Sequence, residues 1–135
     1  MKILAVDPGD QRIGLAVSDP TGTLARPLEI IQHEQRDADA ARVAAVASEQ
    51  EAELILVGEP MGAEGQPTPQ SRKARRMAAA IREHTEIDVI MWDESGSSHA
   101  AQAVRIERGV GREGRQAAAD AEAAAIILQS YLDAK

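Results

Sequence analysis

Acidic residues stand where two predicted strands end, and they are the first candidates for catalysis or metal binding. Asp7 closes the apolar run 2–7, and Asp93 with Glu94 closes a later apolar run in the same manner. Taken singly, each has a simpler explanation, because Asp is a favoured first residue of turns and carboxylates are common on protein surfaces. Their chemistry therefore depends on whether the fold brings them together.

Asp120 is a third acidic candidate, and its spacing sets it apart from ordinary surface charge. On a helix it shares one face with Ala124, Ile127 and Leu128, and we expect this apolar face to pack on the sheet. A buried carboxylate needs a partner, because an unpaired one is strongly disfavoured or becomes protonated. The alternative is an N-cap or first-turn acid, which the helix dipole favours.

These acids indicate a hard metal ion rather than a thiolate or zinc site. The chain has no cysteine and three histidines, which are scattered along it and which we expect at the surface. Carboxylate oxygens suit Mg²⁺ or Mn²⁺ better than Zn²⁺. Two such ions, about 3.5–4 Å apart, can activate a water and stabilise the leaving oxygen in phosphodiester cleavage. The acids alone are a weak signal for this chemistry.

The elements that must position the acids follow from hydrophobic periodicity. Three short apolar runs joined by tight turns predict an antiparallel meander with strands at 2–7, 13–18 and 24–31. Pro27 lacks a ladder donor, so it indicates that the third strand lies at an edge. A continuous apolar run at 53–58 predicts a central strand that is buried on both faces.

Helical periodicity accounts for most of the remaining chain. We expect helices at 36–50, 69–84, 97–107 and 116–133, and a fifth strand at 87–92. This order predicts an α/β fold in which an antiparallel meander and two parallel strands form a mixed five-stranded sheet with helices on both faces. Neither a linker nor a repeat divides the chain, so we expect one domain over residues 1–135.

Overall composition excludes several classes of protein. The net charge of −7 argues against a general nucleic-acid coat protein, which is usually basic. Trp92 and Tyr131 are the only aromatic residues, so a module that stacks bases on aromatic rings is disfavoured. Apolar runs are too short to span a membrane, and the N-terminus lacks the pattern of a signal peptide. We therefore expect a soluble, cytoplasmic protein.

Two basic segments run against the negative overall charge. Residues 71–76 carry four positive charges and no negative one, and residues 105–115 hold four arginines and two glutamates. Such side chains can contact phosphates without reading sequence. The candidates for nucleic-acid binding in these segments are Arg72, Lys73, Arg76, Arg108, Arg112 and Arg115. The alternatives are a solvated helix face for the first segment and a solvated loop for residues 108–115, whose glycines predict a mobile arm.

The combined motifs resemble the YqgF/RuvX family of nucleases, also described as Holliday junction resolvases, within the ribonuclease H-like superfamily. The resemblance extends over nearly the whole chain, and its specificity comes from the combination. The first matching segment is Asp7-Pro8-Gly9 together with Arg12-Ile13-Gly14-Leu15-Ala16-Val17-Ser18-Asp19. The others are Val57-Gly58-Glu59-Pro60 with Gly65, Trp92-Asp93-Glu94 and the stretch from Asp120 to Gln129.

The resemblance implies a catalytic and metal-binding set of Asp7, Glu94 and Asp120, with Asp93 as an alternative or additional metal ligand. It implies Mg²⁺ or Mn²⁺ as cofactor, a ribonuclease H-like sheet, and the bacterial cytoplasm. Arg12, inside the first matching segment, is a further candidate for nucleic-acid binding. One departure is clear: the family continues the Asp-Glu pair with Arg, whereas Ser95 follows here. If that Arg meets a phosphate, this protein must recruit positive charge from elsewhere or bind phosphate weakly.

The function expected from these observations is a metal-dependent nuclease, a hydrolase of ester bonds, acting on structured nucleic acid. The resemblance implies processing of the 5′ end of pre-16S rRNA. One alternative is a Holliday junction resolvase, which would need a symmetric homodimer to cut two strands. Another is a catalytically weak nucleic-acid-binding factor in ribosome assembly. An actin-like kinase is disfavoured, because 135 residues cannot supply its second lobe.

Overall fold

A computed structural model describes residues 1–93 and 112–134 of the chain. Its strands form one sheet in the order β3-β2-β1-β4-β5. The strands are β1 (Ile3–Pro8), β2 (Arg12–Ser18), β3 (Ala25–Gln32), β4 (Leu54–Glu59) and β5 (Asp88–Asp93). The described helices are α1 (Arg36–Glu49), α2 (Pro69–Arg82) and α4 (Arg112–Asp133). The expected helix at 97–107 lies outside the described residues.

The sheet confirms the predicted mixture of antiparallel and parallel strands. β1 pairs antiparallel with β2 and β2 antiparallel with β3, whereas β1 pairs parallel with β4 and β4 parallel with β5. β3 lies at one edge, as Pro27 predicted, and the β2–β3 register shifts beside it between Leu15 and Ala16. All six residues of β4 are buried, as expected for a central strand.

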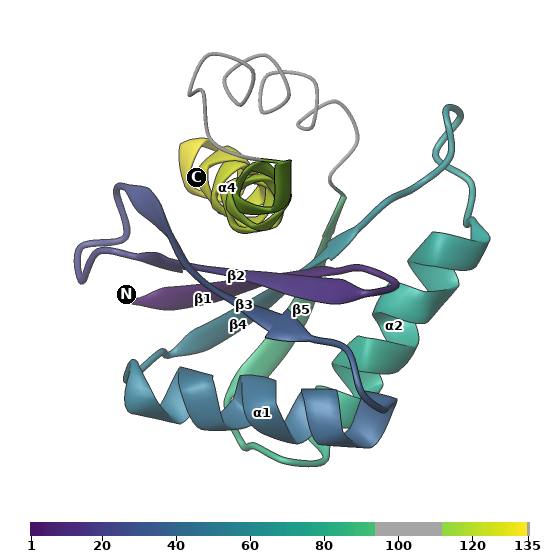
Figure 1. Ribbon diagram of the computed structural model, residues 1–135. Coiled ribbons are helices and arrows are strands. Elements are labelled where there is room, and N and C mark those ends of the chain that lie inside the picture. Colours follow the sequence, from purple (N-terminus) through teal and green to yellow (C-terminus); the bar gives the residue numbers. More distant parts are fainter. Residues whose placement is uncertain (94–111, 135) are drawn as a thin grey trace.

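Helices cover both faces of the sheet, with α1 and α2 on one face and α4 on the other (Figure 1). We call these the α1/α2 face and the α4 face. Alternation along β1 divides its side chains between two cores: Leu4 and Val6 pack with α1 and α2, whereas Ile3 and Ala5 pack with α4. This alternation decides which strand-end acids can share a site.

The carboxyl ends of β1, β4 and β5 meet at one edge of the sheet because these strands are parallel. The same edge holds the beginning of β2 and the end of β3, since both β2 pairings are antiparallel. We call this end of the sheet the carboxyl edge; it runs across the ends of all five strands and differs from the edge strands β3 and β5. α2 begins here, after the loop that follows β4. The edge lies at the right of Figure 1.

One expectation about the basic segment 108–115 is wrong. We expected a mobile arm up to residue 115 and a final helix from residue 116, but α4 already begins at Arg112. The residues that follow are mostly good helix formers, including Arg, Glu, Gln and Ala, and they outweigh the single Gly114. Residues 108–111 lie outside the described residues. Within the described chain, no helix is long and apolar enough to cross a membrane.

Candidate functional site

Asp7 lies at the carboxyl edge on the α4 face. It follows Ala5 and Val6 in β1, and because Ala5 packs under α4, the residue two positions later takes the same face. Asp7 pairs with Gly14 of β2 and is half-buried. The sequence prediction that this acid ends a strand is therefore refined: Asp7 stands within the last two residues of β1, where the strand meets the edge.

α4 packs on this face of the sheet and includes Asp120 in its first half. Its far end is anchored at the opposite edge, where Gln129 accepts the backbone N–H of Ala25 at 3.0 Å and donates to the carbonyl of Thr23 at 3.1 Å. Asp120 precedes Gln129 by nine residues, which corresponds to about 13 Å along a helix axis. The helix backbone therefore carries Asp120 away from the anchored end and over the face that Asp7 occupies.

The helical stripe predicted for α4 is confirmed. Ala124, Ile127 and Leu128 are buried against the sheet, and Tyr131 packs edge-on against Trp92 with ring centroids 5.1 Å apart. Asp120 lies one turn before Ala124 along the helix. It is the ninth residue of α4, so the N-cap and first-turn alternatives are wrong.

Asp93 and Asp7 belong to opposite faces of the sheet. Val89 and Met91 of β5 pack in the α1/α2 core, whereas Trp92 packs under α4, so Asp93 takes the α1/α2 face. This geometry speaks against Asp93 as a ligand that shares a metal ion with Asp7. Glu94 lies outside the described residues.

Glu59 is a strand-end acid that the sequence motifs contained but that was not predicted as a site residue. It ends β4, is only 7% exposed, and accepts a hydrogen bond from Nε of Arg75 in α2. It is the register partner of Asp93 and lies on the α1/α2 face. The available signal was its position directly after an apolar run, which is also the position of Asp7. Its ion pair holds the beginning of α2 against the carboxyl edge.

Arg12 lies at the same edge and on the same face as Asp7. It begins β2, and because Ile13 packs in the α1/α2 core, its neighbour Arg12 takes the α4 face. Its contact with a phosphate beside Asp7 stays a prediction. The structure thus places Asp7 and Arg12 at the same edge and on the same face, while the approach of Asp120 to them stays a prediction.

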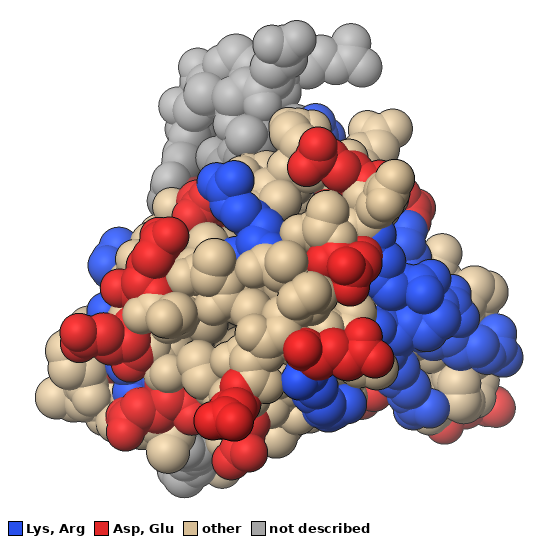
Figure 2. Space-filling model, turned by 90° about the horizontal axis from the view of Figure 1, so that it is seen from below, with Lys and Arg blue, Asp and Glu red and all other residues tan. Residues whose placement is uncertain are grey.

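The basic residues predicted in α2 lie on its first two turns, beside the carboxyl edge but on the α1/α2 side. Arg72 and Arg76 are exposed, and Lys73 pairs with Asp10 of the β1–β2 hairpin. Lys and Arg side chains gather over α2 at the right of Figure 2. The second predicted group of basic residues lies near the start of α4. Arg112 and Arg115 belong to the first turn of this helix, and Arg108 lies outside the described residues.

Ser18 and Asp19, which belong to the first matching segment, serve a structural role at the opposite edge. The buried hydroxyl of Ser18 accepts the N–H of Ile3 at 2.8 Å. Asp19 accepts the N–H groups of Thr23 and Leu24, both at 2.8 Å, and the hydroxyl of Thr21. The hydrogen bond from Leu24 and then that from Thr21 hold the pKa of Asp19 well below its ordinary value.

The donor chemistry of the site fits a hard divalent cation. Asp7 offers carboxylate oxygens in a half-buried position on the α4 face, and the resemblance adds two further carboxylates from Glu94 and Asp120. Among residues 1–93 and the described part of α4, no three His, Asp or Glu side chains gather in a way that could hold a metal ion. The predicted set, however, draws on Glu94 and the Asp120 side chain, which lie outside that description.

Comparison with known proteins gives a family and a fold. The model of the family described as "RuvX: Holliday junction resolvase" matches residues 1–134. A "Putative pre-16S rRNA nuclease" of Desulforamulus reducens is 38% identical over 133 residues, covering 98% of this chain and 97% of the relative. Another of the same description, from Geobacillus kaustophilus, is 39% identical over 137 residues and covers 100% of this chain and 99% of the relative.

Solved structures show the same architecture at low sequence identity. Thermus thermophilus RuvC in complex with a Holliday junction substrate superposes with a TM-score of 0.58 at 20% identity, covering 98% of this chain and 96% of that one. The fowlpox virus Holliday junction resolvase gives a TM-score of 0.57 at 18% identity and covers 100% of both chains. These similarities establish a RuvC-like ribonuclease H fold, as predicted.

Proposed function

The chain belongs to the RuvX family, and from this premise we propose that it is a divalent-metal-dependent nuclease that hydrolyses phosphodiester bonds in structured RNA. Its proposed role is processing of the 5′ end of pre-16S rRNA in the bacterial cytoplasm. The relatives described above support this choice of substrate. The single observation that carries the proposal is the position of Asp7, half-buried at the carboxyl edge on the face that α4 covers.

In this proposal Asp7, Glu94 and Asp120 hold the cation. Asp93 is the weaker candidate, because alternation along β5 turns it to the opposite face from Asp7. When bound, Mg²⁺ or Mn²⁺ supplies an activated water and neutralises charge on the cleaved phosphate, in the two-metal manner. Arg12 lies on the same face and orients the substrate through a phosphate oxygen. It is the described cation best placed to compensate for the Arg that the family has where Ser95 stands here.

An Asp7→Asn variant tests the assignment, because the two side chains are nearly isosteric and only the charge is lost. We expect cleavage of a labelled structured RNA in Mn²⁺ or Mg²⁺ to fall by at least about 100-fold, with circular dichroism unchanged. Asp88→Asn is the matched control, since Asp88 is exposed and begins β5 at the opposite edge. Cleavage by Asp7→Asn at the wild-type rate would refute the site.

Holliday junction resolution is the second candidate, because the matching family model carries that description. A resolvase must place two active sites symmetrically on one junction, so it would act as a dimer. Four-way DNA junctions and structured RNA can be compared as substrates at equal concentration, with the molar mass measured by light scattering. We expect faster cleavage of RNA; symmetric paired cuts in junction DNA by a dimer would instead establish the resolvase. Binding without cleavage of either would indicate an assembly factor.

A further inference from the structure

A cavity of about 210 Å³ opens beside the carboxyl edge, on the face opposite Asp7. Its walls come from three places in the chain. They are Pro8 and Gly9 at the end of β1, then His33, Gln35 and Arg36 at the start of α1, and Lys73 with Met77 of α2. Arg36 also lines a second hollow with Arg76. The cavity therefore lies between the β1–β2 hairpin, close to Asp7 in the chain, and α2. Figure 2 shows the basic surface of α2.

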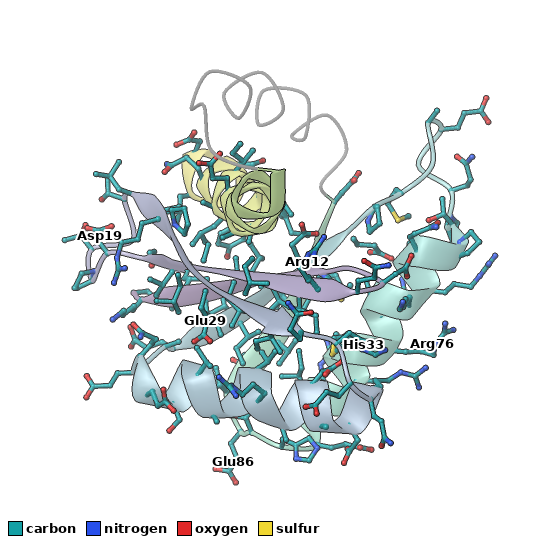
Figure 3. The ribbon with its side chains drawn as sticks, in the orientation of Figure 1. Arg12, Asp19, Glu29, His33, Arg76 and Glu86 are labelled. Atoms are coloured by element: carbon teal, nitrogen blue, oxygen red, sulfur yellow. The ribbon has the colours of Figure 1, made fainter. Side chains whose placement is uncertain are left out.

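A buried carboxylate holds the imidazole at the wall of this cavity. Asp39 is 1% exposed and accepts hydrogen bonds from Nδ1 of His33 and, at 3.0 Å, from the backbone N–H of Glu34. A carboxylate only accepts, so Nδ1 carries the hydrogen and Nε2 is the ring nitrogen left for a ligand. Nε2 donates to an oxyanion when it also carries a hydrogen, in the imidazolium form. The His33 side chain is 35% exposed, which gives a ligand access to it. Figure 3 shows His33 and Arg76 at the same end of the molecule, with Asp19 at the other.

The charged residues that line the cavity are cationic. Arg36 and Lys73 face it together with His33, and none of the described residues that line it is an Asp or a Glu. Lys73 pairs with Asp10, whose side chain is 78% exposed, and the ammonium lowers the pKa of that carboxyl group. An exposed partner can release Lys73 at little cost, because surface ion pairs contribute little stability. Two cations and a hydrogen-bonding imidazole around a small cavity are suited to an oxyanion.

We propose that this cavity binds a phosphate group of the substrate backbone on the side of the sheet away from the metal site. The proposal rests on the proposed nuclease function and adds a binding subsite formed by His33, Arg36 and Lys73. A strand would pass the carboxyl edge at Asp7 and enter this cavity beyond the Pro8-Gly9 turn. Arg76 lies next along the same surface and extends the path over α2.

Backbone recognition fits the aromatic content of the protein. The sequence has one Trp and one Tyr, and these two rings pack against each other under α4, on the other face of the sheet. Base stacking therefore does not contribute to this subsite. The contacts available are charge-assisted hydrogen bonds to phosphate oxygens, which position the strand without reading its sequence.

The first test is metal-free and does not depend on cleavage. Inorganic phosphate is titrated into the wild-type protein, and the imidazole C–H signals are followed by NMR, with His33→Ala used to assign His33. We expect the His33 signals to shift saturably, and the shift to be absent or much weaker in Lys73→Met. Shifts no larger than those of the other two histidines would overturn the proposal.

The second test separates a phosphate contact from a structural ion pair. A short RNA duplex with a 5′ single-stranded extension is bound in EDTA to the wild type and to three variants. Lys73→Met removes the cation, whereas Asp10→Asn breaks the same ion pair and keeps the Lys73 cation. Arg42→Met is the control, because it removes an exposed cation of α1 that pairs with Glu29. We expect roughly fivefold to tenfold weaker binding and a salt slope lower by about 0.7–0.9 for Lys73→Met alone. Equal losses in Lys73→Met and Asp10→Asn would show that only the ion pair matters and would overturn the subsite.

The two proposals can fail separately. If the wild type cleaves RNA but Lys73→Met binds it like Arg42→Met, the subsite is refuted and the nuclease function stands. If cleavage is absent with both metals but phosphate still shifts the His33 signals and Lys73→Met still weakens RNA binding, the nuclease function is refuted and a phosphate-binding subsite remains. The melting temperature of each variant is measured first. A value within a few degrees of the wild type shows that the binding and cleavage results come from folded protein.

Discussion

Two aspartates of the same matching segment have different roles, because they lie at opposite edges of the sheet. Asp7 ends β1 at the carboxyl edge, where the proposed cation binds. Asp19 follows β2 at the other edge and accepts hydrogen bonds within its own turn. A segment shared with a family therefore includes residues that stabilise the fold, such as Asp19, beside candidates for chemistry, such as Asp7.

At the residue scale, Asp19→Ala should destabilise the protein in a manner that depends on pH. The folded-state pKa of Asp19 lies below its ordinary pKa of 3.8. The ionised carboxylate therefore contributes fully to the free energy of unfolding above pH 3.8, and this contribution is lost as pH falls toward the folded-state pKa. We expect the melting temperature at neutral pH to drop by a few degrees relative to the wild type. The difference in melting temperature between the wild type and Asp19→Ala should decrease as the pH is lowered below 3.8. A gap that stays constant down to acid pH would show that the carboxylate's charge is not involved.

At the scale of elements, the beginning of α2 is held to the carboxyl edge by several independent contacts. The Thr68 hydroxyl accepts the N–H of Ser71 at 3.0 Å and donates to the carbonyl of Pro60 at 2.8 Å, while the Ser71 hydroxyl accepts the N–H of Thr68 at 2.7 Å. Arg75 adds its ion pair to Glu59. These contacts fix the basic turns of α2 next to the strand ends, so the helix start positions the proposed RNA-binding surface.

Thr68→Ala should therefore cost both stability and RNA affinity. Loss of an N-cap hydroxyl destabilises a protein by about 1 kcal/mol, with a range of roughly 0.5–2 kcal/mol. Urea unfolding should show this loss, and RNA binding should weaken modestly because α2 becomes less well placed. Thr68→Ser keeps the hydroxyl and is the control. Equal stabilities of the Ala and Ser variants would contradict the role of the capping box.

At the scale of the whole molecule, charge is segregated rather than uniform. The chain carries a net charge of −7, yet Lys and Arg side chains gather over α2 (Figure 2). An acidic protein can bind a polyanion through such a surface, because phosphate contacts act locally and are strongest at low salt. The remaining negative charge opposes non-specific binding elsewhere on the surface.

Paired alanine variants should show which basic surface contacts RNA. For Arg72→Ala with Arg76→Ala, we expect weaker binding and a salt slope lower by about 0.7–0.9 for each lost contact. For Arg112→Ala with Arg115→Ala, we expect the same direction, with stability kept because alanine favours the helix that these residues begin. Filter-binding titrations at several salt concentrations provide the measurement. An unchanged slope in either variant would remove that pair from the interface.

Metal binding should also be visible in the stability of the whole protein. A ligand that binds only the folded state raises the free energy of unfolding, by about 2.7 kcal/mol at 100 times its dissociation constant. We expect Mn²⁺ to raise the melting temperature of the wild type and of Asp88→Asn, and to have little effect on Asp7→Asn. Equal stabilisation of Asp7→Asn would place the bound ion elsewhere.

The sequence by itself determined the secondary-structure elements and their order along the chain. Short apolar runs, tight turns and helical stripes are local patterns, and hydrophobic burial enforces them, so the meander, the buried β4 and the packed stripe of α4 could be predicted. Pro27 predicted its edge strand for an equally local reason, the missing N–H donor. Asp7 and Asp120 were also predicted as site residues in this way, from strand-end position and helical spacing.

Only the tertiary structure decided which of these residues face one another. A strand alternates its side chains, so a shift of one residue changes the face, and this separates Asp93 from Asp7 although both end strands at one edge. The Glu59–Arg75 and His33–Asp39 pairs join residues whose contact no periodicity indicates. The start of α4 at Arg112 depended on propensity competing with glycine, which sequence patterns resolve poorly. Local patterns specify elements, whereas pairing register and packing specify sites.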